Sequence, residues 1–201
     1  TAMGAVDAPV VMVAYADYRC PFCSLFEQQT LPIIAAEFVD KDLLRYEFRD
    51  MPLFGQQSVD AAVAGRAAGN QGRFWEFMSA VSANGVVEGG HPDLPRERLI
   101  GFAQVAGVPD IAKFTADLDD PALLAAVRAD LIAADGALIA GDPDHLDHIG
   151  VIGIAAHGDA HPLRQNGALL IHTAAHGGLG AGGEHLGDVD IAFGSASFVG
   201  M

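Results

Sequence analysis

Near the start of the chain, a segment that is apolar at every position is followed by one with apolar residues at helical spacing. Residues 10–16 (VVMVAYA) are apolar at odd and even positions alike, which is typical of a strand buried on both faces in a sheet covered by helices. Residues 22–38 carry apolar side chains at helical spacing, and we expect Pro32 to kink or break that helix. Residues 43–48 (LLRYEF) predict a second strand. This order of strand, helix and strand predicts a parallel, right-handed βαβ unit.

The middle of the chain, residues 57–138, has the pattern of a helical block. Its segments have helical composition and are separated by short stretches that contain Gly and Pro. We expect helices at residues 57–71, 72–84, 95–107, 110–118 and 121–138. No internal repeat is visible. A block of helices therefore follows the βαβ unit.

The last part of the chain, residues 141–201, has a different composition. It is rich in Gly and Ala and holds seven of the eight histidines. Residues 150–156 and 168–172 are candidate strands, whereas the glycine-rich residues 177–183 have the composition of a flexible linker. This part therefore has a weaker structural pattern than the rest.

Charge excludes several classes of function. The chain has 201 residues and a formal net charge of −15, with 26 acidic against 11 basic side chains. Nucleic acids and anionic membrane surfaces both require clustered Lys and Arg, so we expect neither as a partner. No apolar run approaches the roughly 18 to 20 residues of a membrane span. Residues 1–9 also lack the pattern of a signal peptide.

Cys20 and Cys23 are the only cysteines, and they lie three residues apart where the first strand gives way to the helix. A structural disulfide, half of a metal site and a redox pair are all compatible with this spacing. The position favours a redox pair, with Pro21 suited to a first helical turn. A thiolate there meets unpaired backbone N–H groups, which lower its pKa. Cys20 should be the nucleophile and Cys23 the more buried, resolving thiol.

Around these cysteines the sequence resembles a known family. Three segments, YADYRCPFCSLFEQQTLP, YEFRDMPLFG and DAAVAGRAAGNQGRFWEFMSAVSAN, are similar in order to the DsbA-like thiol–disulfide oxidoreductases of bacterial envelopes. The resemblance covers residues 8–140. It implies an α/β, thioredoxin-like fold with an inserted α-helical domain. Residues 1–55 would be the thioredoxin βαβ part, 56–138 the helical insertion, and 139–201 either the remainder of the fold or an atypical, disordered His- and Gly-rich tail.

The resemblance also implies an activity, namely dithiol–disulfide exchange on extracytoplasmic protein substrates. A disulfide-forming oxidase is the first interpretation, and a reductase or isomerase is the alternative. Cys20 would attack, Cys23 would resolve, and Pro21 with Phe22 would tune the redox potential. Because Phe22 cannot supply the positive charge that a histidine there supplies in some family members, we expect a weaker oxidant.

The same resemblance sets expectations for partners and location. No cofactor and no metal are expected. The partners would be cysteine-containing protein substrates and a membrane or thioredoxin-like protein that recycles the cysteines. The location would be extracytoplasmic: periplasm, cell envelope or secreted.

Other polar and aromatic residues near the motif have simpler interpretations. Arg19 either supplies positive charge to the thiolate or is solvated, and Asp17 either influences Cys23 or caps a strand end. The remaining expectations are that Glu27 and Glu37 are solvated, that His91 is a loop residue, and that Phe74 and Trp75 belong to the helical core.

One element that the resemblance implies is hard to place, namely a cis-proline loop after the helical insertion. Beyond residue 140 the only prolines are Pro143 and Pro162, in unfamiliar contexts, and the Val108–Pro109 pair lies within the helical block, where it suits a helix start. The tail could form the remaining strands by an atypical route that uses Pro143 or Pro162.

The composition of the tail is also compatible with two different hypotheses. The tail could be a metal-binding appendage built on residues 142–148 with His157 and His161, in which case Cys20 and Cys23 would be ligands or a structural disulfide. It could also be read in a shifted frame, since residues 141–144 can be encoded so that a one-nucleotide shift yields Ala-Thr-Pro-Thr. The fold would then lack the sheet edge that completes it.

Overall fold

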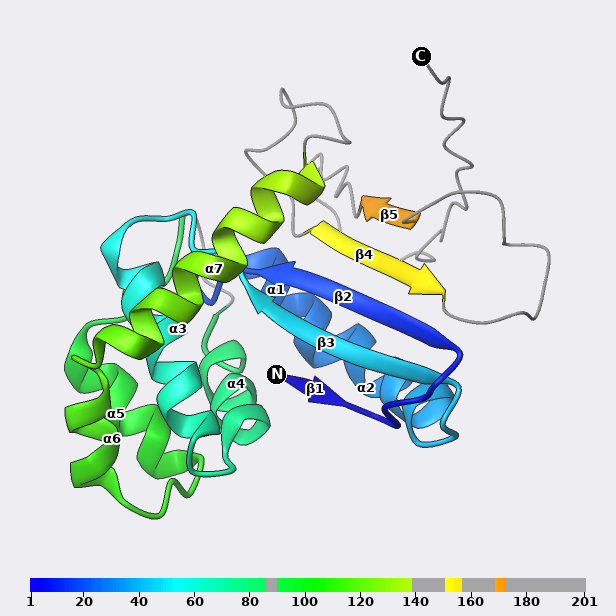
Figure 1. Cartoon of the computed structure of the whole chain (residues 1–201). Coiled ribbons are helices and arrows are strands. Elements are labelled where there is room, and N and C mark those ends of the chain that lie inside the picture. Colours follow the sequence, from blue (N-terminus) through cyan, green and yellow to red (C-terminus); the bar gives the residue numbers. More distant parts are fainter. Residues whose placement is uncertain (86–89, 139–150, 157–168, 173–201) are drawn as a thin grey trace, which may run out of the picture.

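The computed structural model describes residues 1–85, 90–138, 151–156 and 169–172 (Figure 1). These residues form a five-stranded sheet with the order β1-β3-β2-β4-β5. β2 and β3 run parallel, whereas β1, β4 and β5 each pair antiparallel with a neighbour. The strands are β1 (Ala2–Met3), β2 (Val10–Ala16), β3 (Leu44–Asp50), β4 (Val151–Ala156) and β5 (Leu169–His172). The predicted parallel pairing is confirmed.

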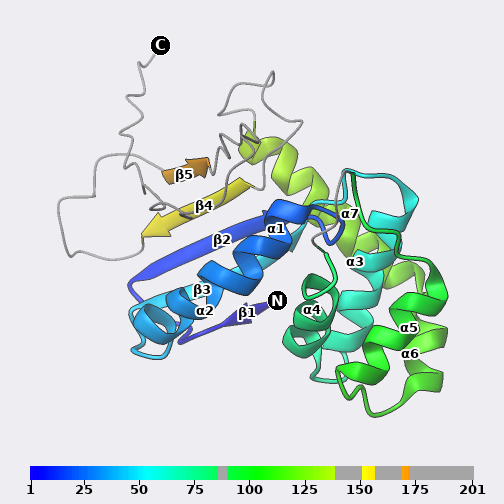
Figure 2. The ribbon, with the colours of Figure 1, turned by 180° about the vertical axis from the view of Figure 1, so that it is seen from behind.

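The central strand β2 is buried unequally on its two faces. Met12, Ala14 and Ala16 are buried, while Val11, Val13 and Tyr15 are half-buried. The prediction of full burial on both faces is therefore wrong. The helical segment 21–39 covers one face of the sheet (Figure 2), and in the described part of the chain no helix runs along the other face.

The segment after the cysteines stays helical from residue 21 to residue 39. It consists of α1 (Pro21–Leu25), η1 (Phe26–Thr30), α2 (Leu31–Ile34) and η2 (Ala35–Val39). The expected break at Pro32 does not occur. Instead, η1 is a wide π turn in which the N–H of Leu31 donates to the carbonyl of Phe26, five residues back. A wider turn accommodates the proline ring, which would otherwise clash with the preceding turn.

The predicted helical block is present, with its helices close to the expected positions. They are α3 (Gln56–Gly69), α4 (Phe74–Ser82), α5 (Arg96–Val105), α6 (Ile111–Asp117) and α7 (Pro121–Leu138). The Asp110 side chain accepts the N–H of Lys113 and caps α6, and Pro109 precedes that cap. The Val108–Pro109 pair therefore belongs to a helix connection, as predicted.

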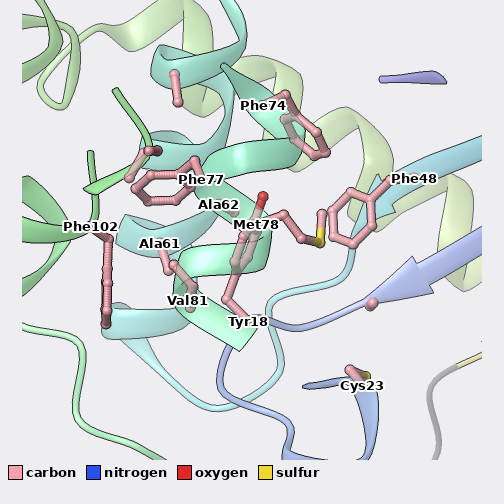
Figure 3. Packing of buried hydrophobic residues seen from close by; sticks show 14 of the residues in the cluster. Tyr18, Cys23, Phe48, Ala61, Ala62, Phe74, Phe77, Met78, Val81 and Phe102 are labelled. Carbon is pink, nitrogen blue, oxygen red and sulfur yellow. The ribbon is translucent and has the colours of Figure 1, made fainter. Parts of the chain in front are cut away.

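The core lies where the helical block meets the carboxyl end of the sheet (Figure 3). The Tyr18 ring packs edge-on against Phe48, with 5.7 Å between ring centroids, and against Phe77, at 6.3 Å. A Cβ atom on Gly65 would overlap the Tyr18 hydroxyl oxygen, so this close approach requires glycine. Phe74 is buried and Trp75 packs against the same cluster, as predicted for core aromatics.

A charged cluster also joins the helical block to the sheet. Arg66 on α3 donates to Asp50 at the end of β3, at 2.6 Å, and to Asp130 on α7. Asp130 also accepts the backbone N–H of Asp50 at 3.1 Å. Both aspartates are buried, so Arg66 neutralises two carboxylates that lie out of water.

The tail contributes β4 and β5, as predicted for residues 150–156 and 168–172. β4 pairs with β2 from Val151 to Ala156 and supplies the sheet edge that the shifted-frame hypothesis expected to be missing. Pro143, Pro162 and the residues of the suggested metal appendage lie outside the described residues. In the described part of the chain, no helix is long and apolar enough to cross a membrane.

Candidate active site

The cysteine motif lies where β2 turns into α1. β2 ends at Ala16, and Cys20 has an extended backbone at the N-cap of α1, with φ −79° and ψ 116°. The N–H of Cys20 donates to the carbonyl of Asp17 at 3.1 Å, and Pro21 is the first helical residue. The predicted position of Cys20 at a helix start is therefore confirmed.

Both cysteines are free thiols and both are buried. Their exposed fractions are similar, 5% for Cys20 and 9% for Cys23, so the expected difference in exposure is not seen. The prediction that Cys23 is the more buried thiol is therefore wrong. The two cysteines differ instead in their surroundings, because Cys20 caps α1 and Cys23 lines a small cavity.

The two thiols differ in acidity. A hydrogen bond from the Cys23 thiol, together with the backbone N–H groups of Phe22 and Cys23, lowers the pKa of Cys20 to about 7. Burial and the charge of Asp17 act in the opposite direction. The same hydrogen bond and burial raise the pKa of Cys23 well above its ordinary value. The Cys20 thiolate thus forms near neutral pH while Cys23 keeps its proton.

The cavity beside Cys23 is small, about 10 Å³, close to the minimum that holds one water molecule. Helix, strand and helical block all contribute to it. Its lining comprises Ala16, Asp17, Tyr18, Cys23, Ser24, Glu27, Phe48, Met78 and Ser82. Cys23 therefore lies beside a small, partly open cavity that two acidic residues, Asp17 and Glu27, also line.

Glu27 is one of these carboxyl groups, and the expectation that it is solvated is wrong. It lies one helical turn after Cys23, and its Oε1 accepts a hydrogen bond from the Tyr46 hydroxyl at 3.1 Å. Burial raises the pKa of Glu27 to about 7, although the Tyr46 hydrogen bond opposes this. The spacing of four residues from Cys23 was a usable signal, since such residues share a helix face. Glu37 is exposed and pairs with Lys41, as expected.

Asp17 fixes the backbone around the motif. Its carboxylate accepts the N–H groups of Arg19, at 2.7 Å, of Leu53, at 2.6 Å, and of Phe54, at 3.2 Å. These bonds attach the segment after β3 to the turn that precedes Cys20. Asp17 is thus a cap at the strand end, and it also lines the cavity beside Cys23.

The prediction that Arg19 is solvated is wrong. Its side chain is only 15% exposed, and it donates to the carbonyls of Pro92, at 2.9 Å, and Phe54. Its guanidinium also lies 3.8 Å from the Asp93 carboxylate. These contacts engage it with neighbouring loops, so it is a structural tie between the helical block and the active-site turn.

The described part of the chain has no group of three or more His, Cys, Asp or Glu side chains that could hold a metal ion. Phe22 lies between the cysteines with 41% of its surface exposed, and Leu53 nearby in the segment held by Asp17 is 43% exposed. The motif is therefore bordered by apolar side chains that reach solvent.

Comparison with known proteins agrees with this geometry. The profile of a family described as thioredoxin matches residues 1–143. The oxidised BdbD protein of Bacillus subtilis superposes with a TM-score of 0.65 at 21% identity, covering 78% of this chain and 81% of that one. The "Disulfide bond formation protein D" of Bacillus subtilis is 34% identical over 77 residues, 37% of this chain and 35% of that protein.

Another relative has the name of an antiporter. The "Na(+)/H(+) antiporter NhaA" of Herminiimonas arsenicoxydans is 36% identical over 131 residues, which is 65% of this chain but only 19% of the antiporter. The chain therefore spans about a fifth of the length of that relative.

The described residues have the thioredoxin fold seen in the DsbA-type structures, as predicted. The chain belongs to the thioredoxin family.

Proposed function

We propose that this chain catalyses dithiol–disulfide exchange on protein thiols through Cys20 and Cys23, and that it works as a disulfide-forming oxidase. The observation that carries the proposal is the opposite perturbation of the two thiols: the pKa of Cys20 is lowered to about 7 and that of Cys23 is raised. An oxidant needs a stable reduced form, and a stabilised Cys20 thiolate provides one.

The reaction proceeds in two exchanges. A substrate thiolate attacks Cys20 Sγ of the disulfide form, the Cys20–Cys23 bond breaks, and Cys23 leaves as a thiolate that takes up a proton. A second substrate thiolate then attacks the substrate sulfur of the mixed disulfide and displaces the Cys20 thiolate. The substrate has lost two electrons and the cysteine pair has gained them.

Glu27 is the group best suited to handle the Cys23 proton. Its carboxyl lines the same cavity, and its pKa of about 7 lets it hold or release a proton near neutral pH. Proton transfer by a positioned group is most efficient when its pKa lies near the working pH. Glu27 would therefore donate to the departing Cys23 thiolate and take the proton back in the reverse reaction.

Pro21 and Phe22, between the cysteines, are the residues that would set the redox potential. Phe22 carries no charge, so the potential should lie below that of an otherwise equal protein with histidine there. Substrates would be cysteine-containing proteins outside the cytoplasm. A membrane or thioredoxin-like partner would reoxidise the pair, in keeping with the disulfide-formation name of the Bacillus subtilis relative.

The antiporter name does not extend to this chain as a transport function. The shared stretch is 19% of the antiporter and overlaps the thioredoxin-family match. The shared function would then be thiol exchange, carried out beside a membrane transporter in that relative.

The deciding experiment is a redox titration against glutathione, with the intact mass recorded at each point. An oxidase should show a potential between about −120 and −200 mV, whereas a value near −270 mV would indicate a reductase. The absence of exchange, with both thiols still titratable, would refute the proposal. Stoichiometric zinc or copper with an unreactive Cys20 would instead favour the metal-binding alternative.

A further inference from the structure

Residues 91–94 of the helical block contact the turn that precedes Cys20. His91 Nδ1 lies 3.0 Å from the carbonyl oxygen of Arg19, and the His91 ring stacks on Phe54 with 3.6 Å between centroids and 21° between planes. Arg19 in turn donates to the carbonyl of Pro92. Three segments that are distant in sequence thus meet at the residue before the nucleophile.

The hydrogen bond defines the state of the imidazole. A carbonyl oxygen can only accept, so Nδ1 of His91 carries a proton and Nε2 is the nitrogen that gains or loses one. Both contacts suit the charged ring, because the carbonyl accepts from it and the face of Phe54 attracts cations.

The same bond limits the distance from His91 to the nucleophile. The Arg19 carbonyl belongs to the peptide group that joins Arg19 to Cys20, so covalent geometry places His91 Nδ1 within about 9 Å of Cys20 Sγ. This is close to the screening length at physiological salt, and a charge at that separation still acts on the thiolate.

The other charges around His91 are already compensated or fixed. The Arg19 guanidinium is engaged with the carbonyls of Pro92 and Phe54 and lies beside the Asp93 carboxylate. The Asp17 carboxylate accepts three backbone N–H groups and disfavours the Cys20 thiolate.

We propose that His91 tunes the Cys20–Cys23 pair from outside the cysteine motif: its imidazolium stabilises the Cys20 thiolate and thereby the reduced protein. His91 is a positioning and electrostatic residue, not one that exchanges electrons. The inference rests on the proposed thiol exchange. A charged side chain at position 91 then makes the protein a stronger oxidant than a neutral side chain there does.

The test compares the whole chain with two variants. His91→Gln keeps an N–H that can donate to the Arg19 carbonyl but cannot become charged, and His91→Lys stays charged throughout. Arg96→Gln is the control, because it removes one charge from an exposed pair with Asp119 in the helical block. Each is titrated for the thiolate absorbance of Cys20 and measured for the equilibrium with glutathione at pH 7.

His91→Gln should raise the pKa of the Cys20 thiol and shift the glutathione equilibrium toward the protein disulfide by about twofold to threefold. His91→Lys should hold the thiolate at least as well as the natural chain, and Arg96→Gln should change nothing. Unchanged values in His91→Gln, or the same shift in His91→Lys, would overturn the inference. If the natural chain does not exchange with glutathione, the proposed function fails, while the thiolate titration still decides the role of His91.

Discussion

The Tyr46 hydroxyl on β3 donates a hydrogen bond to Oε1 of Glu27, at 3.1 Å, beside the cavity that Cys23 lines. The contact holds a carboxyl in the interior, where burial raises its pKa to about 7. The folded-state pKa thus lies above the unfolded value of about 4.3. The contribution of Glu27 to folding is complete below about pH 4 and is lost as the pH rises through about 7.

Glu27→Gln should therefore stabilise the chain relative to the natural protein at pH 8 but not at pH 4. The gain should grow between these values to at most about 3 kcal/mol, because the glutamine amide never ionises. Urea unfolding at pH 4, 6 and 8 measures it. Glu37→Gln is the matched control on the same helical segment, since Glu37 is exposed, and its difference from the natural protein should stay within about 0.5 kcal/mol. Similar pH profiles for the two variants would contradict an interior Glu27.

The two cysteines should react differently when each is left alone. In Cys23→Ser, a serine hydroxyl can still donate to the Cys20 sulfur, so Cys20 should react readily with oxidised glutathione and remain as a mixed disulfide. In Cys20→Ser the hydrogen bond with the Cys20 thiol is lost, but burial still raises the pKa of Cys23 and should make reaction at pH 7 far slower. Intact mass after timed incubation distinguishes the variants. Equal rates would argue against Cys20 as the attacking thiol.

The contact between Gly65 and Tyr18 predicts a steric effect on stability. A Cβ atom at Gly65 would overlap a hydroxyl that finds no hydrogen-bond partner among the described residues. Gly65→Ala should thus destabilise the chain by about 2 to 3 kcal/mol through overpacking, and Tyr18→Phe should recover part of the loss. Gly101→Ala is the control, because nothing lies within 4 Å of its Cβ, and it should stabilise α5 by up to about 1 kcal/mol. Thermal unfolding measures these changes in stability. The variants compared are Gly65→Ala, Tyr18→Phe, Gly101→Ala and the Gly65→Ala, Tyr18→Phe double variant.

The Arg66 cluster predicts a pH-dependent loss. Arg66→Met leaves the buried carboxylate of Asp50 without its cation and Asp130 with Arg49 alone, and should cost about 3 kcal/mol at pH 8. Burial raises the pKa of Asp50 to about 6 even with Arg66 present, so the loss should shrink at pH 5, where the carboxyl takes up a proton. Arg96→Met, which breaks an exposed pair, should cost less than about 1 kcal/mol. Denaturant unfolding at pH 5 and pH 8 measures the loss of stability. An equal loss at the two pH values would contradict the prediction.

Features that follow from the local sequence pattern could be predicted, whereas features that depend on contacts between distant residues could not. The strand at 10–16, the helices of the block and the cysteines at a helix start follow from periodicity and from the nature of helix termini. Glu27 sits at a polar position of an amphipathic segment, and only the contact with Tyr46, 19 residues away, places it inside. The His91 contact with Arg19 spans 72 residues, which no local pattern encodes. Of the kink or break expected at Pro32, the break does not occur, because a π turn accommodates the proline ring.

Phe22 offers a direct change in oxidising strength. Its side chain is 41% exposed, so Phe22→His should fold without strain and place a titratable group between the cysteines. An imidazolium there would stabilise the Cys20 thiolate, and the glutathione equilibrium should move toward the reduced protein by about tenfold, or ~30 mV. Phe22→Gln is the control, because it is polar but uncharged and should move the equilibrium far less. If the two variants shift it equally, the apolar ring of Phe22, rather than its lack of charge, limits the potential.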